Sequence, residues 1–409
     1  MKKYKMCEAE DKVFEYIKNN IGRSIREQKA LKPVITPCID SAFLCFFYWD
    51  TYFANLALAE IGNFEQIENN LDNMKWFVDT LGFVPNAYEP DQEDNGLNRS
   101  QPPLFARGVW DYYCIKNDVA ILEKYLPALE KEHEFWQKNR MTSCGLNRYW
   151  HHATDKYLVE FYDVITERLK LRKDTYEDKI GQGAHFLAIA ESGWDFTCRF
   201  PEGENVYACG NYAPVDLNGI LYNQERIIAQ ANYLLGNQEK SQLFNQYAEE
   251  RREKMNRYML SNDGFYYDYN FITNTHSPYL SSASFCPFAM GVSDNLQMLE
   301  KTLNRLEEEH GVTSCEKKDR TIFDQWDYPT MWPPLMYFCV TALKRLNSKH
   351  FMRVADKYLS TVRCVFEKTS SLWEKYDSVQ GGVAVTREYG THKMMGWTAG
   401  VYAYILKNR

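Results

Sequence analysis

The sequence lacks an apolar run of about 18 residues, so it predicts no membrane-spanning helix. Residues 1–20 carry positive charge but no apolar core of the kind found in secretory signals, and they resemble the start of an amphipathic helix. Long blocks of Lys and Arg are also missing, and the formal net charge is −7. Because an acidic chain repels phosphate backbones and anionic lipids, we expect neither nucleic acid nor membranes as partners.

Recognisable cysteine and histidine motifs are missing as well. The 11 cysteines form an odd set without a Cys-x-x-Cys pair or a Cys/His cluster of the zinc type. We expect most of them to be small buried hydrophobic residues in a reducing compartment, which predicts a cytoplasmic location. His151, His152 and His392 have no metal-like spacing. The sequence therefore predicts neither a metal ion nor a cofactor.

Aromatic residues, by contrast, are abundant. The chain of 409 residues contains 10 Trp, 29 Tyr and 23 Phe, which together make up 15% of it. Composition alone favours a large core with amphipathic rings at its edges. The alternative is a carbohydrate site, in which ring faces stack on the apolar C–H faces of sugars.

Apolar residues recur at three- and four-residue spacing along most of the chain, which predicts a mainly α-helical protein. The predicted helices cover 52–60, 64–80, 118–139, 223–236, 241–260, 296–309, 332–346 and 351–367. Two runs are typical of strands, 157–165 and 264–272, and the second is interpreted as a hairpin between helices.

Pro, Gly and Asn gather between the predicted helices, and no linker rich in Ser or Pro divides the chain. We therefore expect one domain over residues 1–409. About a dozen helices with substantial loops fit a toroid of helical hairpins, in which alternate loops crowd one face. A helical solenoid is the alternative, but the sequence shows no repeat of about 30–45 residues.

Three of these loops place a carboxylate beside a tryptophan, in Glu191–Asp195, Asp324–Pro329 and Trp373–Asp377. Hydrolysis of a glycosidic bond needs one carboxyl group that stays protonated and a second that is ionised. Burial against apolar rings raises the pKa of a carboxyl group, so a neighbouring tryptophan can help to separate the two roles. Any one of these pairs alone is weak evidence, because a glutamate near a tryptophan is common.

Taken in order, these and other segments resemble the motifs of the trehalase family, glycoside hydrolase family 37, and of its relatives in family 63. The similar segments are Phe47–Phe53 (Tyr-Tyr-Trp-Asp-Ser-Tyr-Phe in the family), Pro85-Asn86, Asn98–Pro103 (Arg-Ser-Gln-Pro-Pro), Glu191–Phe196 (Glu-Ser-Gly-Trp-Asp-Phe), Pro214–Asn218, Gln325–Pro329 (Gln-Trp-Asp-x-Pro), Glu374–Asp377 (Glu-Lys-Tyr-Asp) and Glu388-Tyr389 with Trp397 after it. Arg172–Tyr176 is a looser match to Arg-Pro-Glu-Ser-Tyr.

The resemblance implies an all-α, single-domain (α/α)6 barrel that cleaves an α-glycosidic bond with inversion. It assigns Asp195 as general acid and Glu374 as general base, with carboxyl groups roughly 6.5–9.5 Å apart to leave room for a water. The substrate-binding residues that it implies are Trp49, Asp50, Asn86, Arg99, Gln101, Arg172, Asp174, Trp194, Gln325, Trp332, Glu388 and Trp397. Core packing is an alternative role for Trp332 and Trp397. For Asp327 the alternative is a structural role as a hydrogen-bond acceptor.

Two departures from the family pattern concern the leaving-group side. Residues 39–46 hold none of the arginines or glycines of the family's arginine-rich stretch, and the family's Gly-rich loop is reduced to Gly381-Gly382. We therefore expect a conserved glucose pocket, a changed second subsite, and a small α-glucoside as substrate. Lys393 or His392 is a candidate partner for an aglycone that bears a carboxylate.

Three alternatives remain at this stage. A true trehalase with a remodelled second subsite is the alternative within the same class. A catalytically inactive sugar-binding protein belongs to another class, and the presence of both Asp195 and Glu374 argues against it. An inverting phosphorylase needs a phosphate site, for which the sequence near Glu374 shows no additional basic cluster.

Overall fold

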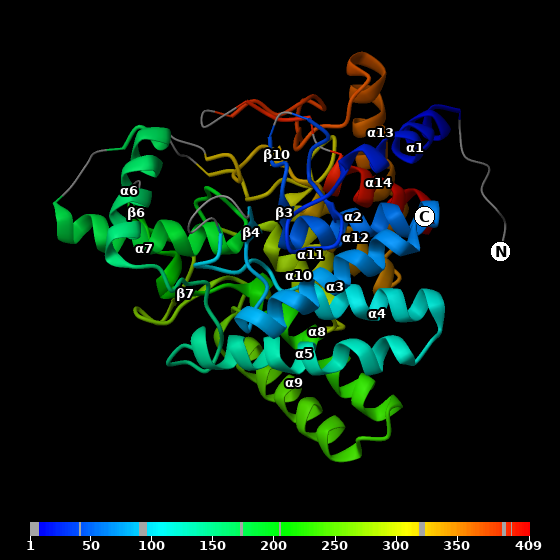
Figure 1. The fold of residues 1–409 in the computed structure, drawn as a ribbon. Helices are drawn as coiled ribbons and strands as arrows, with labels where there is room; N and C mark the ends of the chain where they lie inside the picture. Colours follow the sequence, from blue (N-terminus) through cyan, green and yellow to red (C-terminus); the bar gives the residue numbers. More distant parts are fainter. Residues whose placement is uncertain are drawn as a thin grey trace.

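Helices form most of the protein in a computed structural model (Figure 1). The structure describes residues 8–40, 42–89, 96–171, 175–203, 206–318, 324–386, 390–393 and 395–409. The α-helices are α1 (Glu8–Asn20), α2 (Tyr48–Ile61), α3 (Phe64–Leu81), α4 (Phe105–Lys116), α5 (Ala120–Asn139), α6 (Asp155–Leu169), α7 (Tyr176–Ser192), α8 (Val215–Leu234), α9 (Gln238–Tyr258), α10 (Cys286–Met290), α11 (Leu296–Leu306), α12 (Pro333–Arg345), α13 (Phe351–Thr369) and α14 (Gly396–Asn408).

Six of the described helices close a ring. Helix α2 contacts α4, α4 contacts α8, α8 contacts α10, α10 contacts α12, α12 contacts α14, and α14 returns to α2. Helices α3, α5, α9 and α13 alternate with them along the chain and pack against the ring from outside. This arrangement is the (α/α)6 barrel that was predicted. The α6–α7 hairpin, at the left of Figure 1, is additional to the alternation.

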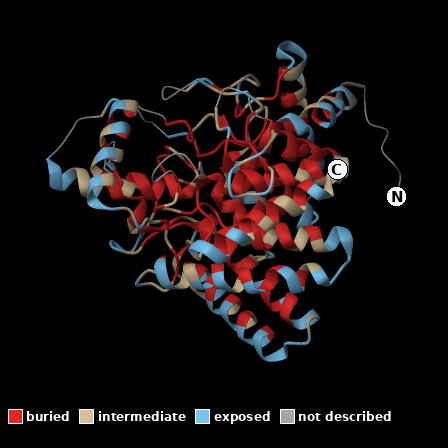
Figure 2. Cartoon of the chain, in the orientation of Figure 1, coloured by how far each residue is buried: buried red, intermediate tan, exposed pale blue. Residues whose placement is uncertain are grey.

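The distribution of apolar residues explains which helices lie inside. Helix α12 is apolar nearly all round, and every residue from Pro333 to Leu343 is buried. Helix α9 is polar except for one face, on which Phe244, Ala248 and Met255 are buried at helical spacing. Figure 2 shows the result as buried helices at the centre and exposed outer faces on the helices around them.

Short strands occur in the connections. They are β1 (Ile25–Arg26), β2 (Val34–Ile35), β3 (Phe46–Phe47), β4 (Ala87–Tyr88), β5 (Pro201–Gly203), β6 (Val206–Tyr207), β7 (Tyr212–Ala213), β8 (Tyr269–Asn270), β9 (Thr275–His276), β10 (Thr330–Met331) and β11 (Tyr376–Asp377). All the pairs are antiparallel: β1 with β2, β3 with β4, β5 with β6, β7 with β8, β8 with β9, and β10 with β11. The pairs β3–β4, β7–β8 and β10–β11 join segments that lie far apart in the sequence, whereas the other three pairs are local.

The structure corrects one predicted strand. Residues 157–165 lie within helix α6, because Leu158, Tyr162 and Ile165 form a buried helical face and Thr154 caps the helix through its side chain. The aromatic and β-branched residues of this run were therefore misleading. The other predicted strand run, 264–272, contains β8, which pairs with β9 as a hairpin between α9 and α10. Among the described residues, no helix is long and apolar enough to cross a membrane.

Candidate active site

A cavity of about 330 Å³ opens at the end of the barrel where α2, α12 and α14 begin. Ten of the predicted site residues line it: Trp49, Asp50, Asn86, Arg99, Gln101, Asp195, Gln325, Trp332, Glu374 and Trp397. They come from segments spread over most of the chain, and the barrel brings them together. Both candidate catalytic residues therefore face one shared space.

The chain positions these residues in two ways. Asp195 lies in the loop after α7, and Glu374 lies in the loop between α13 and β11. Trp49, Asp50 and Trp397 instead occupy the first turns of α2 and α14. Residues in the first turn of an inner helix are held by the rigid barrel, so this part of the cavity has a fixed shape.

Asp195 is held through its backbone and has a buried carboxyl group with a raised pKa. The Gln325 side-chain Nε2 donates a hydrogen bond to the Asp195 carbonyl. Burial raises the pKa of the Asp195 carboxyl above its ordinary value, and the charge of Glu374 raises it further. Arg168 and Arg99 oppose this effect by favouring the ionised form. A raised pKa suits a group that must still carry a proton near neutral pH.

Glu374 has a different environment. It is only 2% exposed, and its Oε2 lies 2.9 Å from Nζ of Lys375, which supplies a positive charge. Its backbone N–H donates to the His392 carbonyl at 2.9 Å, and its carbonyl accepts a 2.9 Å bond from Nε1 of Trp397. Glu374 is therefore fixed at the cavity by its backbone on one side and by a buried cation on the other.

Asp50 is a third carboxyl group in the cavity. Burial raises its pKa to about 8, and the charge of Glu374 contributes in the same direction. At neutral pH the Asp50 carboxyl group is therefore protonated in most molecules. A neutral carboxylic acid can both donate and accept hydrogen bonds, which suits contact with sugar hydroxyls.

Tryptophans form the apolar wall of the cavity. The rings of Trp326 and Trp332 stack at 3.7 Å between centroids, with planes 3° apart, and Trp397 lies edge-on to Trp332 at 5.7 Å. Trp332 and Trp397 are 1% and 5% exposed, so they belong to the core and to the cavity wall at once. Trp194 does not line the cavity: it packs on Trp326, with the Arg199 guanidinium 4.1 Å above its ring.

Hydrogen bonds hold in place the segment between α3 and α4 that contains Asn86, Arg99 and Gln101. Gln101 Oε1 accepts a 3.1 Å hydrogen bond from the backbone of Trp49, at the start of α2. The Asn86 backbone N–H donates to the Arg99 carbonyl at 2.9 Å. Arg99 donates from Nη1 to Asn98 at 3.0 Å, while its buried Nε has no partner among the described residues. The bond to Asn98 therefore holds this guanidinium at the cavity.

Several lining residues were not predicted from the sequence. They are Pro37, Phe43, Phe47, Ala87, Phe161, Val164, Ile165, Arg168, Ala190, Gly193 and Trp326. Those from α6 have helical spacing, but the interpretation of 157–165 as a strand concealed it. Lys393 and His392 are not among the lining residues. The predictions for Arg172, Asp174 and Glu388 lie outside the described residues.

Gly193 combines a required backbone conformation with a close approach to the site. It ends helix α7 with φ of +76°, and a Cβ there would lie 2.8 Å from Cζ2 of Trp49. We expect Gly193→Ala to cost about 1–2 kcal/mol for the left-handed conformation and about 1–3 kcal/mol more for the clash.

Gly62 provides the matched control for urea unfolding. It ends α2 with φ of +78°, but a Cβ there meets nothing within 4 Å. Gly62→Ala should therefore show only the conformational cost. Equal destabilisation by the two substitutions would contradict tight packing of Trp49 against the segment that carries Asp195.

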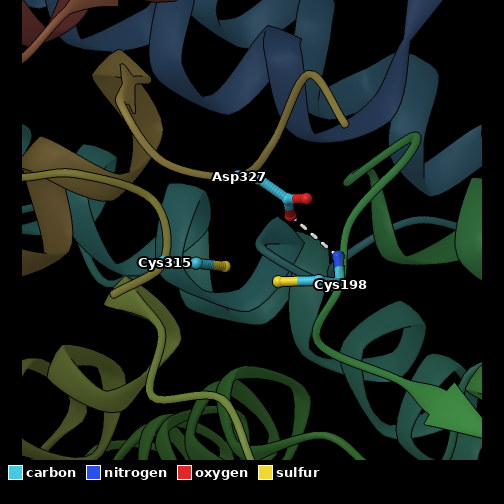
Figure 3. Close-up of side chains that lie close together, drawn as sticks. All are labelled: Cys198, Cys315 and Asp327. Carbon is cyan, nitrogen blue, oxygen red and sulfur yellow. Dashed lines mark hydrogen bonds between the residues drawn. The ribbon is translucent and has the colours of Figure 1, made fainter. Parts of the chain in front are cut away.

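One buried group near the cavity has donor atoms suited to a metal ion. Cys198, Cys315 and Asp327 place one ligand atom each within 4.8 Å of one another, although their sequence spacing gives no such signal (Figure 3). Asp327 already accepts hydrogen bonds from the backbone of Cys198 at 2.7 Å, from the Thr197 hydroxyl at 3.2 Å and from the backbone of Asp324 at 2.9 Å. These bonds match the structural acceptor role considered for Asp327, and they tie the segment after Asp195 to the loop that contains Gln325.

Comparisons with known proteins identify the family of this chain. The family profile described as Trehalase matches residues 12–409. A periplasmic trehalase of Xanthomonas oryzae is 29% identical over 390 residues, which cover 88% of this chain and 65% of the relative. A trehalase of Apis mellifera is 28% identical over 404 residues, covering 91% of this chain and 63% of the relative. The chain thus spans about two thirds of the length of these relatives.

Two solved structures support the fold assignment. Neutral trehalase Nth1 from Saccharomyces cerevisiae superposes with a TM-score of 0.74 at 22% identity, covering 96% of this chain and 79% of the other. A GH63 mannosylglycerate hydrolase from Thermus thermophilus, in complex with Tris and D-glycerate, gives 0.67 at 13% identity, covering 97% of this chain and 100% of the other.

The comparisons also correct the predicted location. The cytoplasmic prediction is wrong, because bacterial relatives from Xanthomonas oryzae, Pseudomonas aeruginosa and Escherichia coli are periplasmic trehalases. The prediction used the charge of residues 1–20 and the unpaired cysteines. Neither feature determines the compartment to which a protein is delivered.

Proposed function

The chain belongs to the trehalase family, and from that premise we propose that it hydrolyses the α-glycosidic bond of a small α-glucoside with inversion. The observation that carries the proposal is that Asp195 and Glu374 line one cavity in contrasting environments. Burial raises the pKa of Asp195, whereas Glu374 is paired with the cation of Lys375. Two carboxyl groups in different environments around one cavity are what acid–base hydrolysis requires.

In the proposed reaction, Asp195 donates its proton to the glycosidic oxygen as the C–O bond breaks. Glu374 removes a proton from a water molecule, whose oxygen bonds to the anomeric carbon from the opposite face. The products are the free aglycone and a sugar of inverted configuration. After the turnover Asp195 is ionised and Glu374 is protonated, so a proton must return from Glu374 to Asp195 through solvent.

The remaining residues of the cavity would bind the glucose unit. Its polar side chains offer hydroxyl partners, and its tryptophans offer flat apolar surfaces to the C–H faces of the sugar. The residues that we assign to this pocket are Trp49, Asp50, Asn86, Arg99, Gln101, Gln325, Trp332 and Trp397. Trp194 supports the wall from behind, through its contact with Trp326.

The names of the relatives favour α,α-trehalose as the first substrate to test. A second candidate is a different small α-glucoside, and the wall contributed by α6 favours it. Phe161, Val164 and Ile165 give that wall an apolar surface, and Arg168 adds a positive charge close to Asp195. Because the acid must face the leaving group, this wall borders the second subsite.

The direct test is turnover of a panel followed by NMR immediately after mixing. The panel is trehalose, kojibiose, glucosylglycerate, mannosylglycerate and p-nitrophenyl α-glucoside, each with and without phosphate. Inverting hydrolysis of trehalose releases β-glucose and α-glucose in equal amounts before mutarotation. Release of α-glucose alone would contradict inversion, and turnover that requires phosphate would identify a phosphorylase. No turnover of any compound would favour the inactive sugar-binding alternative.

A further inference from the structure

Lys375 is a buried cation next to the proposed base, and the reaction scheme above gives it no role. It is 0% exposed, although a lysine is seldom buried without specific partners. Its Nζ lies 2.9 Å from Oε2 of Glu374 and 3.1 Å from Oε1 of Gln325. The ammonium group also lies 4.8 Å from the centre of the Trp332 ring. All three of these neighbours line the cavity.

Gln325 extends this contact to the acid. An ammonium group only donates hydrogen bonds, so the side-chain oxygen of Gln325 must face Lys375. The amide nitrogen then points the other way, and it donates to the backbone carbonyl of Asp195. One side-chain amide therefore joins a cation bound to Glu374 to the backbone that carries Asp195.

We infer that Lys375 is a positioning residue, which keeps Glu374 ionised and, through Gln325, fixes the base relative to the acid. The inference rests on the proposed function, because it assigns Glu374 the role of base. Lys375 itself does not line the cavity, so its effect on the reaction is exerted through Glu374 and Gln325.

The groups around Glu374 show why a cation is needed there. Asp50 on α2, Asp195 after α7 and the Cys38 thiol all interact with the charge of Glu374. All three are acids, and in the proposed scheme Asp50 and Asp195 carry protons, so none of them supplies the positive charge that a buried carboxylate needs. The Lys375 ammonium, which is hydrogen-bonded to Glu374, supplies it. Without it, Glu374 should take up a proton at a higher pH, and the acidic limb of the rate profile should move upward.

The first experiment compares Lys375→Met with Lys375→Arg. For Lys375→Met we expect a loss of about 100-fold in kcat with little change in KM, because the base is misplaced while the sugar contacts remain. The acidic limb of its pH profile of kcat should move to higher pH by about one unit or more. Lys375→Arg keeps the charge and should leave the limb where it is. If Lys375→Met does not fold, Lys375→Gln is the second neutral variant.

Lys357 provides the control. Lys357 lies on α13, and its Nζ is 2.7 Å from Oε1 of Glu307. Neither residue lines the cavity. Lys357→Met removes a lysine from an ion pair in the same way but should leave the pH profile unchanged. If Lys375→Met has the same pH profile of kcat as the native protein, the inference is overturned, even where the native protein hydrolyses its substrate as proposed.

A second readout does not depend on turnover. Calorimetry of 1-deoxynojirimycin binding between pH 4 and pH 6, where its ring amine stays protonated, reports on Glu374, because the cationic sugar mimic is attracted to an ionised carboxylate. Weaker binding that recovers only at higher pH in Lys375→Met supports the role of Lys375, even if no substrate is hydrolysed. Absence of hydrolysis with such a shift would reject only the proposed function. An unshifted binding profile, or no binding at any pH, would reject the role of Lys375.

Discussion

Asp195→Asn should lower kcat on trehalose, or on whichever α-glucoside the panel identifies, by about 10²–10⁴-fold. Asparagine keeps the size of the side chain but has no acidic proton for the glycosidic oxygen. A sugar alkoxide is a poor leaving group, so its departure depends on that proton. Initial rates at saturating substrate give the measurement, and Asp79→Asn, which removes an exposed carboxylate on α3, is the matched control.

The choice of substrate separates an acid from a merely structural residue. Fluoride leaves with little help from an acid, so Asp195→Asn should hydrolyse α-glucosyl fluoride far better, relative to the native protein, than it hydrolyses trehalose. Burial raises the pKa of Asp195, and we expect ionisation of this group to produce the basic limb of the native rate profile. That limb should disappear in the variant. An equal loss on both substrates would remove Asp195 from the role of acid.

Helical periodicity and the rich loops predicted a toroid of helical hairpins, and the resemblance to the trehalase family implied the (α/α)6 barrel; the structure adds which helices lie inside. Helix α12 is apolar on all sides, whereas α13 has an apolar stripe. The order of the motifs along the chain supported the family resemblance. This information is local, and it survives in a single sequence.

Contacts between distant segments were harder to predict. Lys375 stands beside Glu374 in the sequence, but its bond to Gln325 depends on the packing of two loops about 50 residues apart. Arg168 was missed because α6 was interpreted as a strand, so its proximity to Asp195 could not be inferred. Trp194 is adjacent to Asp195, yet its ring points to Arg199 and Trp326. Neighbours in sequence therefore identified the site but not the direction of each side chain.

Glu374→Gln should lower kcat by about 10²–10⁴-fold on trehalose and on α-glucosyl fluoride alike. Water must be activated with either leaving group, so the better leaving group gives no rescue. Glutamine can still accept the hydrogen bond from Lys375, so the loss reports the missing base rather than a collapsed cavity. Urea unfolding of the variant checks this point.

A smaller side chain at the same position tests the direction of attack. In Glu374→Ala, azide can enter from the side of the missing carboxylate and displace fluoride from α-glucosyl fluoride without a base. Azide bonds to the anomeric carbon as fluoride leaves, so inversion gives β-glucosyl azide, which NMR identifies. Formation of the α-azide would place the nucleophile on the other face. Because Asp195 and Glu374 must then lie on the same side of the sugar, that product would exclude the single-displacement mechanism.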